Sequence, residues 1–313
     1  MHQDYEVWRA ELIFSKLGIV IVNYSQVNDT IECINSLLMA GALLSQIIIV
    51  DNCSIDNSVE ILKEQYDSSL TILELDENKG YPHGLNQGIP NALKKGAEWL
   101  LLMNNDVVVD KDFIKELNSA TQDQPEAQLI GPAILYYDHP EIIWYIGYKL
   151  IPGTLIGVRS YRGRKYNANI PKYLSIDVMH GCTMMVNKKV FIEIGYFDDS
   201  SLIYGDDADF SWRARKAGFK MIAATRAKMW HKISLTMGEL KPRTRYLRTR
   251  NTIKFYKKYS HGLSLPVMFL FTIAKGFLTL IKDLCGRNCY LVRPLFWGIV
   301  DGWGSSQKGA HLF

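Results

Sequence analysis

Four short apolar runs, each ending in polar residues, constrain the fold of the first hundred residues more than any other feature of this chain. Continuous apolar runs of this length are typical of strands that are buried on both faces of a parallel sheet. Stretches with helical spacing lie between them, the first marked by Ile31, Ile34 and Leu37. The alternation predicts an α/β sheet with right-handed crossover connections. The runs are residues 17–23, 46–51, 70–74 and 99–104.

Polar side chains follow three of these runs, at the points where the strands would end. Parallel α/β sheets bind their ligands at the carboxyl ends of the strands, and a purely structural turn would need fewer polar residues there. We therefore expect a binding site along this edge of the sheet. The residues concerned are Asn23, Tyr24, Asp51, Asn52, Asn104, Asn105 and Asp106.

Residues 104–106 read Asn-Asn-Asp. One carboxylate with two amides can bind a hard divalent cation that already carries diphosphate oxygens. The same residues also suit an Asx turn between a strand and a loop. A lone histidine is more often structural, but His231 would join Asp106 as a metal ligand if the fold brings the two together.

A glycine-rich block follows the third apolar run and opens a helix. It contains Asn78, Gly80, Gly84, Asn86 and Gly88. Glycines let a backbone approach a ligand closely, and a helix N-terminus favours phosphate. The spacing is neither that of a dinucleotide fingerprint nor that of a P-loop. A tight turn is the alternative explanation.

Three carboxylates within four residues, Asp206, Asp207 and Asp209, precede an amphipathic stretch. We expect them at a helix N-terminus, where the backbone N–H groups and the helix dipole favour negative charge. A carboxylate held there can accept a proton or bind a cation. Plain N-capping is the alternative.

The regular alternation of strand and helix patterns ends after residue 106. A stretch rich in Gly, Pro, Arg and Tyr without periodicity predicts a long loop. The expected segments are a helix at 112–120, a strand at 128–134, the loop at 151–175, strands at 175–179 and 182–186 around His180-Gly181, short strands at 220–223 and 227–230, and a basic helix at 242–259.

The net charge of +4 hides a strong asymmetry. Residues 213–258 contain fifteen Lys/Arg and one acid, whereas residues 1–212 contain sixteen Lys/Arg and twenty-nine acids. A basic segment on an acidic body favours an anionic partner, which can be nucleic acid, a diphosphate or an anionic membrane surface. A solvated helical face is the alternative.

Residues 265–284 are apolar enough to suggest a membrane span, but Pro266, Lys275 and Lys282 argue against one. Polar residues recur every three or four positions and line one stripe of a helix. Such a helix lies on a membrane or packs on a partner, and packing within the same chain is the alternative. The polar stripe comprises Thr272, Lys275, Gly276, Thr279, Lys282 and Asp283.

Five scattered cysteines form no disulfide framework, and their odd number favours a reducing, cytosolic setting. The N-terminal residues contain no basic region followed by an apolar core, so no signal peptide is expected.

Taken in order, these motifs resemble those of the family 2 glycosyltransferases with the GT-A fold, and more narrowly the bacterial rhamnosyltransferase and galactofuranosyltransferase branch. The resemblance covers roughly residues 17–260. It implies a mixed, mostly parallel sheet flanked by helices, with a helical C-terminal extension. The catalytic domain would be residues 1–240, with a nucleotide-sugar-binding half at 1–110 and an acceptor half at 111–240. The basic and amphipathic C-terminal region would be 241–313.

The resemblance implies a role for each polar residue at the sheet edge. Tyr24 and Asp51 would hold the nucleotide base. Asp106, as the last carboxylate of the family's DxD element, and His231 would bind the metal on the diphosphate. The other residues expected to bind the nucleotide-sugar are Asn23, Asn78, Gly80, Asn86, Asn104 and Asn105.

Asp207 matches the catalytic base of the family, with Asp206 beside it near the acceptor. The implied reaction is an inverting, metal-dependent transfer of rhamnose, galactofuranose or a related hexose. The donor would be a UDP- or dTDP-sugar, the cofactor Mn²⁺ or Mg²⁺, and the acceptor a hydroxyl of a glycan or lipid-linked glycan. The implied setting is cell-surface polysaccharide synthesis, such as O-antigen or capsule, in the cytoplasm and peripheral on the inner face of the plasma membrane. Nucleic acid is not expected as a partner, and an oligomer is compatible with this function.

The chain departs from the family pattern at three points. The DxD element is reduced to Asn-Asn-Asp, which leaves one carboxylate, Asp106. The usual Glu-Asp pair is here Asp206-Asp207, and Pro82 stands where a small flexible residue is common. Two other functions remain open. A nucleotidyltransferase or dehydrogenase on a similar sheet is disfavoured by the missing dinucleotide glycines, and a non-catalytic nucleotide-sugar-binding scaffold is disfavoured by the intact acidic cluster.

Overall fold

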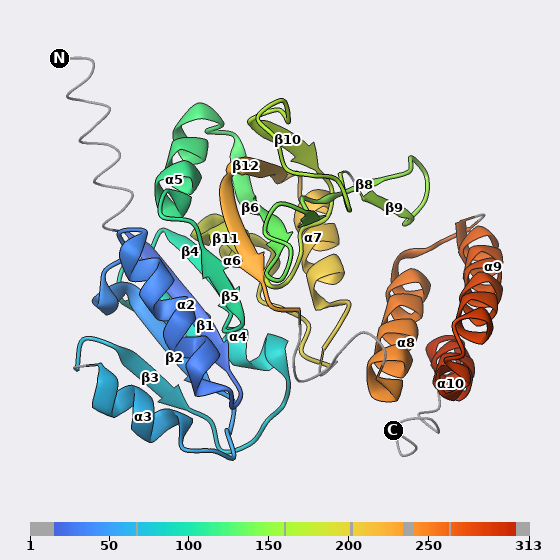
Figure 1. The fold of residues 1–313 in the computed structure, drawn as a ribbon. Helices are drawn as coiled ribbons and strands as arrows, with labels where there is room; N and C mark the ends of the chain where they lie inside the picture. The colour runs from blue at the N-terminus through green and yellow to red at the C-terminus, as the bar shows by residue number, and fades with distance from the viewer. Residues whose placement is uncertain are drawn as a thin grey trace.

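The computed structural model describes residues 16–304 except for 67, 160, 201–202, 234–240 and 263. Figure 1 shows a central sheet flanked by helices and, beside it, a group of helices from the C-terminal part of the chain. The N-terminal half alternates strands and helices, as the apolar runs predict. Its elements are β1 (Leu17–Asn23), α2 (Val27–Met39), the 3₁₀ helix η1 (Leu44–Gln46), β2 (Ile47–Asp51), α3 (Ser58–Gln65), β3 (Thr71–Glu74), α4 (Tyr81–Lys94) and β4 (Trp99–Asn104).

The second half adds the strands that make the sheet mixed. Its elements are β5 (Val107–Val109), α5 (Phe113–Asp123), β6 (Ala127–Tyr136), β7 (Ile143–Tyr145), β8 (Tyr148–Leu150), β9 (Gly157–Arg159), β10 (Tyr173–Ile176), β11 (Thr183–Asn187), α6 (Lys188–Ile194), α7 (Asp206–Lys216) and β12 (Lys220–His231). The strand order is β10-β12-β6-β11-β4-β1-β2-β3, while β5 pairs with β12 and β7 with β6. Strands β1 to β4 are parallel, and β11 runs antiparallel to both β4 and β6. Strands β8 and β9 form a separate hairpin.

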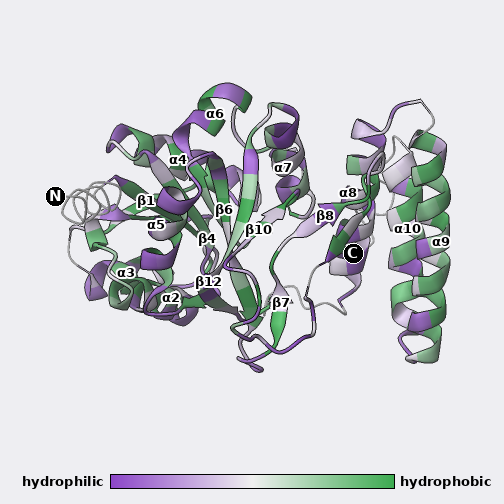
Figure 2. Ribbon diagram, turned by 90° about the horizontal axis from the view of Figure 1, so that it is seen from above, coloured by the Kyte–Doolittle hydropathy of each residue, from purple (hydrophilic) through white to green (hydrophobic). Residues whose placement is uncertain are grey.

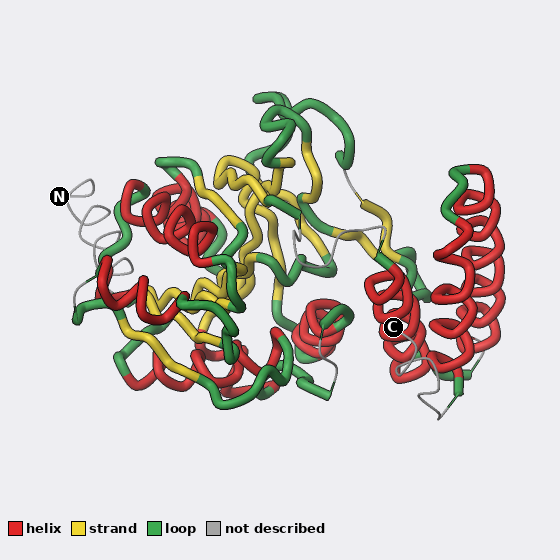
Figure 3. The backbone as a smooth tube through the Cα atoms, turned by 60° about the horizontal axis from the view of Figure 1, so that its bottom comes forward, coloured by secondary structure: helices red, strands yellow, loops and turns green. Residues whose placement is uncertain are grey.

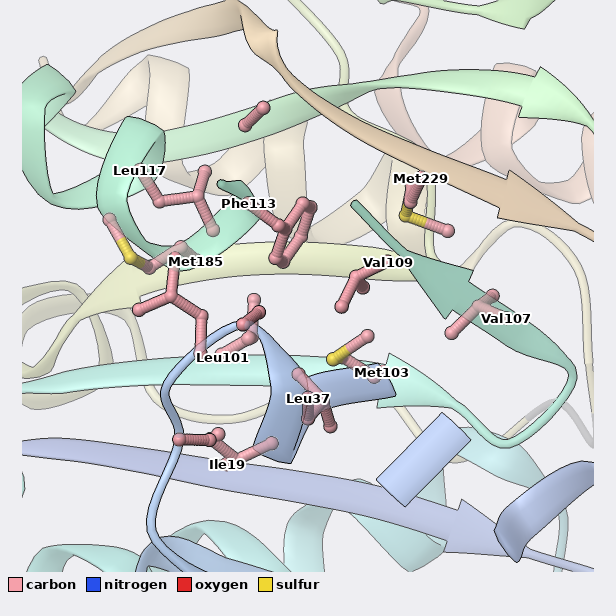
Figure 4. Packing of buried hydrophobic residues seen from close by; sticks show 14 of the residues in the cluster. Ile19, Leu37, Leu101, Met103, Val107, Val109, Phe113, Leu117, Met185 and Met229 are labelled. Atoms are coloured by element: carbon pink, nitrogen blue, oxygen red, sulfur yellow. The ribbon is translucent and has the colours of Figure 1, made fainter. Parts of the chain in front are cut away.

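Alternate residues of β1 enter two different cores, because successive side chains of a strand point to opposite faces. The strands of the sheet are largely apolar along their length (Figure 2) and lie between layers of helices (Figure 3). Ile19 packs with Leu37 of α2 and Leu101 of β4 in one core, part of which is drawn in Figure 4. Val20 and Val22 pack against α4 in the other.

Two glycines of the glycine-rich block lie against the sheet rather than at a ligand position. A Cβ on Gly84 would lie 2.8 Å from Val22 Cγ1, and one on Gly88 would lie 2.4 Å from Val20 Cγ1. Both distances are too short for a real carbon contact. These glycines therefore let α4 lie close on β1, which sets the position of the N-terminus of α4.

The region around β10 and β12 differs from the sequence expectation. The expected loop at 151–175 contains β9 and the start of β10, and the strand expected at 175–179 is β10, shifted toward the N-terminus by its pairing with β12. The two short strands expected at 220–223 and 227–230 are one strand with a shift of register between Ala224 and Lys228. The Thr225 hydroxyl at this irregularity donates to the Pro171 carbonyl at 2.8 Å. The interruption of the apolar pattern is therefore a bulge that joins β12 to the segment before β10.

Three further helices form the C-terminal region: α8 (Pro242–Tyr259), α9 (Ser264–Cys285) and α10 (Val292–Trp303), with the short 3₁₀ helix η2 (Cys289–Leu291) between the last two. Glycines let α10 pack closely on α8. A Cβ on Gly298 would lie 2.8 Å from Thr249 Cβ, and one on Gly302 would lie 2.7 Å from Ile253 Cβ. Among the described helices, α9 alone is long and apolar enough to cross a membrane, as judged by length and composition.

Candidate active site

Asn23 and Asp51 lie side by side at the carboxyl ends of β1 and β2, where the parallel register pairs them. Asn23 Nδ2 donates to Asp51 Oδ1 at 2.7 Å, and both side chains are buried. Asp51 also accepts from the Ser54 backbone N–H at 2.9 Å and from the Ser54 hydroxyl at 2.5 Å. Asn105 Nδ2 donates to Asn23 Oδ1 at 3.3 Å. These bonds fix a polar cluster of Asn23, Asp51, Ser54 and Asn105, which we call the polar floor. Tyr24, whose ring is exposed, follows Asn23 in the chain.

Asn78 and Asn52 shape the turn that leads into α4. Asn78 Oδ1 accepts from the Gly80 backbone N–H at 2.9 Å and from Asn52 Nδ2 at 3.0 Å. Asn52 Nδ2 also donates to the Gly80 carbonyl at 3.1 Å. Gly80 has a φ of 101°, which favours glycine. The start of α4 is thereby fixed next to the end of β2.

The amide of Asn86 is occupied by a backbone partner. Nδ2 donates to the Phe197 carbonyl at 2.9 Å, and Oδ1 accepts from the Phe197 backbone N–H at 3.0 Å. Asn86 thus ties α4 to the segment after α6. Local sequence could not show this role, because the partner lies 111 residues away along the chain.

Asp106 and His231 meet because β5 pairs with the end of β12. The antiparallel register places His231 opposite Val107, the residue after Asp106. His231 Nε2 lies 3.2 Å from Asp106 Oδ1, and both side chains are buried. The Lys232 backbone N–H donates to the Asp106 carbonyl at 2.9 Å and fixes this pairing. The contact that would make His231 a metal-ligand candidate is therefore present.

These two side chains have the spacing of neighbouring ligands on one cation. Ligands about 2.1 Å from an octahedral ion lie about 3 Å from one another. Both ring nitrogens of His231 are buried, and despite the nearby carboxylate neither makes a well-aligned hydrogen bond within the described part of the chain. No group of three or more His, Cys, Asp or Glu side chains suited to a metal occurs among the described residues. The donor set fits a divalent ion that takes its remaining ligands from a diphosphate and water.

Asp206 and Asp207 are the first two residues of α7. Asp206 is buried and Asp207 is half-buried. The Asp207 carboxylate accepts from the Gly181 backbone N–H at 3.1 Å and from the Ala208 backbone N–H at 2.8 Å. Burial raises the pKa of both carboxyls, and the charge of Asp207 raises the pKa of Asp206 further. The two N–H groups partly offset the rise in the pKa of Asp207. The Gly181 and Ala208 N–H groups therefore favour the ionised form of Asp207.

Asp209, the third carboxylate of the cluster, connects α7 to the basic helix α8. It accepts from Arg213 Nε at 2.8 Å within α7, and from Lys258 Nζ at 2.7 Å and the Tyr259 hydroxyl at 2.6 Å on α8. Lys258 Nζ also donates to Asp198 at 2.7 Å. These partners come from the basic segment, about fifty residues further along the chain, so the local sequence around Asp209 does not reveal them.

The turn at 180–182 connects the two halves of the site. The Asn104 backbone N–H donates to the Cys182 carbonyl at 2.9 Å, so one end of the turn is fixed to β4, two residues before Asp106. Gly181 bonds Asp207 through its N–H and accepts from the Tyr81 hydroxyl at 2.8 Å through its carbonyl. The turn thus fixes the position of the end of β4 relative to the start of α7.

His180, a residue that sequence analysis did not select, lies at the start of this turn. Its ring centroid is 4.5 Å from that of Trp144, whose own centroid is 4.8 Å from that of His231. The Cys182 backbone N–H donates to His180 Nδ1 at 3.1 Å. Burial, followed by the neighbouring charges of His231 and Arg248, lowers the pKa of His180 to about 3, so its ring is neutral at physiological pH.

The mixed sheet flanked by helices, with helices at its C-terminal end, is the GT-A fold. A solved structure shares the fold across nearly the whole chain. It is the mannosyltransferase PcManGT from Pyrobaculum calidifontis in complex with GDP-Man and Mn²⁺, with a TM-score of 0.53 and 15% identity, covering 98% of this chain and 85% of that one.

The family follows from the sequence match. The model of the family described as Glycosyl transferase family 2 matches residues 18–195, more than half of the chain, and the chain belongs to this family. The low-salt glycan biosynthesis hexosyltransferase Agl10 of Haloferax volcanii is 27% identical over 66% of this chain and 64% of that protein, which is less than two thirds of its length. The N-acetylglucosaminyl-diphospho-decaprenol L-rhamnosyltransferase of Mycobacterium tuberculosis is 22% identical over 69% of this chain and 75% of that protein.

Proposed function

We propose that this protein is an inverting, metal-dependent glycosyltransferase that moves a sugar from a nucleoside diphosphate to an acceptor hydroxyl. The observation that carries the proposal is that the turn at 180–182 connects the candidate base to the candidate cation site. This turn bonds Asp207 through Gly181 and bonds β4 through Cys182, two residues before the cation pair of Asp106 and His231. A base and a diphosphate site held at fixed positions on one turn are what a single displacement at an anomeric carbon needs.

Asp207 takes the proton of the acceptor hydroxyl in this mechanism. The hydroxyl oxygen attacks the anomeric carbon, the bond from that carbon to the diphosphate breaks, and the proton moves to the Asp207 carboxylate. Base assistance of this kind contributes about 10²–10⁴ in rate. Burial and the charge of Asp207 raise the pKa of Asp206, so its protonated form can donate to an acceptor oxygen beside Asp207.

The leaving side of the site consists of Asp106, His231 and the polar floor. A Mn²⁺ or Mg²⁺ ion held by Asp106 and His231 would offset the negative charge on the leaving diphosphate. Asn23, Asn104 and Asn105 border this position. Tyr24 and Asp51 lie at the neighbouring strand ends, where they would hold the base of a UDP- or dTDP-sugar, while Asn78, Gly80 and Asn86 set the position of α4 beside them. We retain this donor class because the family resemblance implies it.

The acceptor is proposed to be a glycan carried on a membrane lipid. The Mycobacterium tuberculosis relative bears the name of a decaprenol-linked acceptor, and the C-terminal helix α9 is apolar enough to reach a bilayer. The transferred sugar would be rhamnose, galactofuranose or a related hexose, in synthesis of a cell-surface polysaccharide such as O-antigen or capsule. The enzyme would work in the cytoplasm, peripheral on the inner face of the plasma membrane.

A panel of nucleotide-sugars tests the donor class. UDP- and dTDP-sugars with Mn²⁺ are expected to raise the unfolding temperature by roughly 5 °C at about a hundred times the dissociation constant, because a ligand that binds the native state alone stabilises it. GDP-sugars with Mn²⁺ and each nucleotide-sugar without metal serve as controls. A chain that is stabilised by none of these ligands, or equally by GDP-sugars, would contradict the proposed donor.

A further inference from the structure

The outer face of α9 consists of exposed apolar side chains: Phe269, Leu270, Ile273, Phe277, Leu278 and Ile281. Part of the polar stripe of the same helix faces inward, whereas its lysines Lys275 and Lys282 are exposed. Thr272 and Asp283 are buried, and Asp283 accepts from Arg245 of α8 at 2.9 Å. A Cβ on Gly276 would lie 2.9 Å from Ile299 of α10. Unlike a soluble surface helix, α9 therefore exposes a continuous apolar face while it buries two polar side chains, and Figure 2 shows it at the outer edge of the molecule.

The charges around this face have one sign. Both acids between residues 264 and 304 are buried and bonded to α8: Asp283 to Arg245, and Asp301 to the Tyr246 hydroxyl at 2.8 Å. The basic side chains of the same stretch are all exposed. They are Lys275, Lys282, Arg287 and Arg293.

We propose that the outer face of α9 inserts flat into one leaflet of a bilayer that contains anionic lipids. An apolar face bordered by exposed cations matches the boundary between acyl chains and negatively charged headgroups. A transmembrane orientation of α9 would place the Asp283–Arg245 pair within the apolar layer. Pairing of this face with the same face of a second copy would bring the four cations of each chain near those of the other. The repulsion between these like charges disfavours a second copy as the partner of this face. The inference rests on the lipid-linked acceptor proposed above, and its test reads lipid binding rather than sugar transfer.

Flotation of the full-length protein with vesicles tests the face directly. We expect it to float with vesicles of phosphatidylcholine mixed with phosphatidylglycerol, and to bind vesicles of phosphatidylcholine alone more weakly. The triple variant Leu270→Ser/Phe277→Ser/Leu278→Ser should remain in the soluble fraction. Replacing Lys282 and Arg293 by glutamine should weaken binding to the mixed vesicles roughly 25-fold, at about fivefold per cation.

Three exposed apolar residues of the catalytic domain provide a matched control. Met39, Ile55 and Ile192 are at least as exposed as the residues changed on α9, and their replacement by serine should leave flotation unchanged. Equal flotation of wild type and the α9 triple variant would overturn the proposal. A different result would also overturn it: a wild-type protein that binds no vesicle and forms a dimer without lipid, where the α9 triple variant is a monomer. A second copy of the chain would then cover the apolar face.

His180 has a hydrogen-bond donor that the mechanism above does not use. A backbone N–H can donate to Nδ1 only when that nitrogen carries no proton, so the contact from Cys182 fixes the neutral tautomer with its proton on Nε2. The ring is partly exposed, and Nε2 makes no hydrogen bond to the described residues. Trp144 packs against both this ring and that of His231, and the centroids of the two histidine rings are 6.4 Å apart. The next residue, Gly181, bonds Asp207.

The geometry points to His180 Nε2–H as a donor to a substrate oxygen between the diphosphate and the acceptor hydroxyl. This assignment rests on the proposed function. A donor whose tautomer is already fixed by the protein needs no reorganisation when the substrate binds. The oxygen can belong to the donor sugar or to the acceptor. The variants described below distinguish the two, because the Michaelis constant of the substrate that carries this oxygen should change.

Two substitutions separate this role from the structural one. In His180→Asn the side-chain oxygen can still accept from the Cys182 N–H, but the Nε2 donor is lost. In His180→Gln the amide nitrogen can occupy the Nε2 position, but the acceptor for Cys182 is lost. We expect kcat/KM for transfer to fall about 10- to 100-fold in His180→Asn and about threefold or less in His180→Gln.

Thermal unfolding should show the opposite order, with His180→Gln the less stable variant. If His180→Asn transfers sugar as the wild type does, or if activity follows stability in both variants, His180 is purely structural. A wild-type protein that transfers no sugar at all would instead count against the proposed function.

Discussion

Replacing Asp207 by asparagine is expected to lower sugar transfer by about 10²- to 10⁴-fold, the usual contribution of a general base. A sugar hydroxyl is a poor nucleophile near neutral pH, and the N–H groups of Gly181 and Ala208 stabilise the ionised form of Asp207. Donor affinity should stay within about threefold of wild type, because the cation pair is untouched. The transfer rate of the wild type should fall as the pH is lowered through the raised pKa of the acidic pair, since the base must be ionised. Initial rates over a pH series and calorimetric titration with the donor measure these effects.

Asp206→Asn is the matched control. Burial and the charge of Asp207 raise the pKa of Asp206, so an asparagine resembles its protonated form and transfer should fall by no more than about tenfold. The folded-state pKa of Asp206 lies above its unfolded value of about 3.9. The stability that this carboxyl contributes is therefore present below the unfolded value and is lost as the pH rises through the folded value. Asp206→Asn should accordingly unfold at a higher temperature than wild type at neutral pH. If it loses more transfer than Asp207→Asn does, the two roles are reversed.

Replacing Asp106 by asparagine is expected to lower transfer by about 10²- to 10³-fold, through loss of charge stabilisation at the leaving diphosphate. The amide keeps the shape of the side chain beside His231 but removes the one carboxylate at this position. The activation of transfer by Mn²⁺ should weaken, and so should the stabilisation of the protein by donor with Mn²⁺. Rates measured over a series of Mn²⁺ concentrations check the first effect, and thermal unfolding checks the second.

Asp110→Asn provides the comparison for that experiment. Asp110 lies just beyond the same short strand, but its carboxylate bonds Lys228 at 2.9 Å and does not contact His231. Its replacement should leave the Mn²⁺ dependence unchanged. Identical Mn²⁺ activation curves for wild type and Asp106→Asn would exclude Asp106 as a ligand.

The strands with strong periodicity could be predicted from the sequence, and those without it could not. Buried runs such as 17–23 and 99–104 are long enough to show their pattern, and they form β1 and β4. Strands β5, β7 and β8 have three residues each, too few for a periodic signal. Their existence depends on strands elsewhere in the chain. This matters for the site, because β5 is the element that brings Asp106 to His231.

Polar residues of the site could be selected from the sequence, but their partners could not. Asn86 and Asn78 belong to one motif, yet Asn86 bonds Phe197 and Asn78 shapes the turn before α4. Asp209 could be predicted to lie at the start of a helix, but its partners Lys258 and Tyr259 come from a helix about fifty residues later. His180 had no distinguishing neighbours in sequence, because its ring contacts come from β7 and β12, which are distant along the chain.

The basic segment shows the same limit. Its charge suggested an anionic partner, but part of that charge is used within the chain. Lys258 bonds Asp198 and Asp209, and Arg245 bonds Asp283. Helix α8 is thus the internal connection between the catalytic domain and the helices with the apolar face. Lys275, Lys282, Arg287 and Arg293, further along the chain, are the exposed cations that border the apolar face of α9.

The configuration of the product tests the central claim most directly. The purified protein is incubated with Mn²⁺, a UDP- or dTDP-sugar of known anomeric configuration and a lipid-linked glycan acceptor, and the product is examined by proton NMR while release of nucleoside diphosphate is measured. The structure predicts one new glycosidic bond of inverted configuration for each nucleoside diphosphate released, with almost none formed by Asp207→Asn. A product with the configuration of the donor, or inverted product formed equally well by Asp207→Asn, would contradict the mechanism.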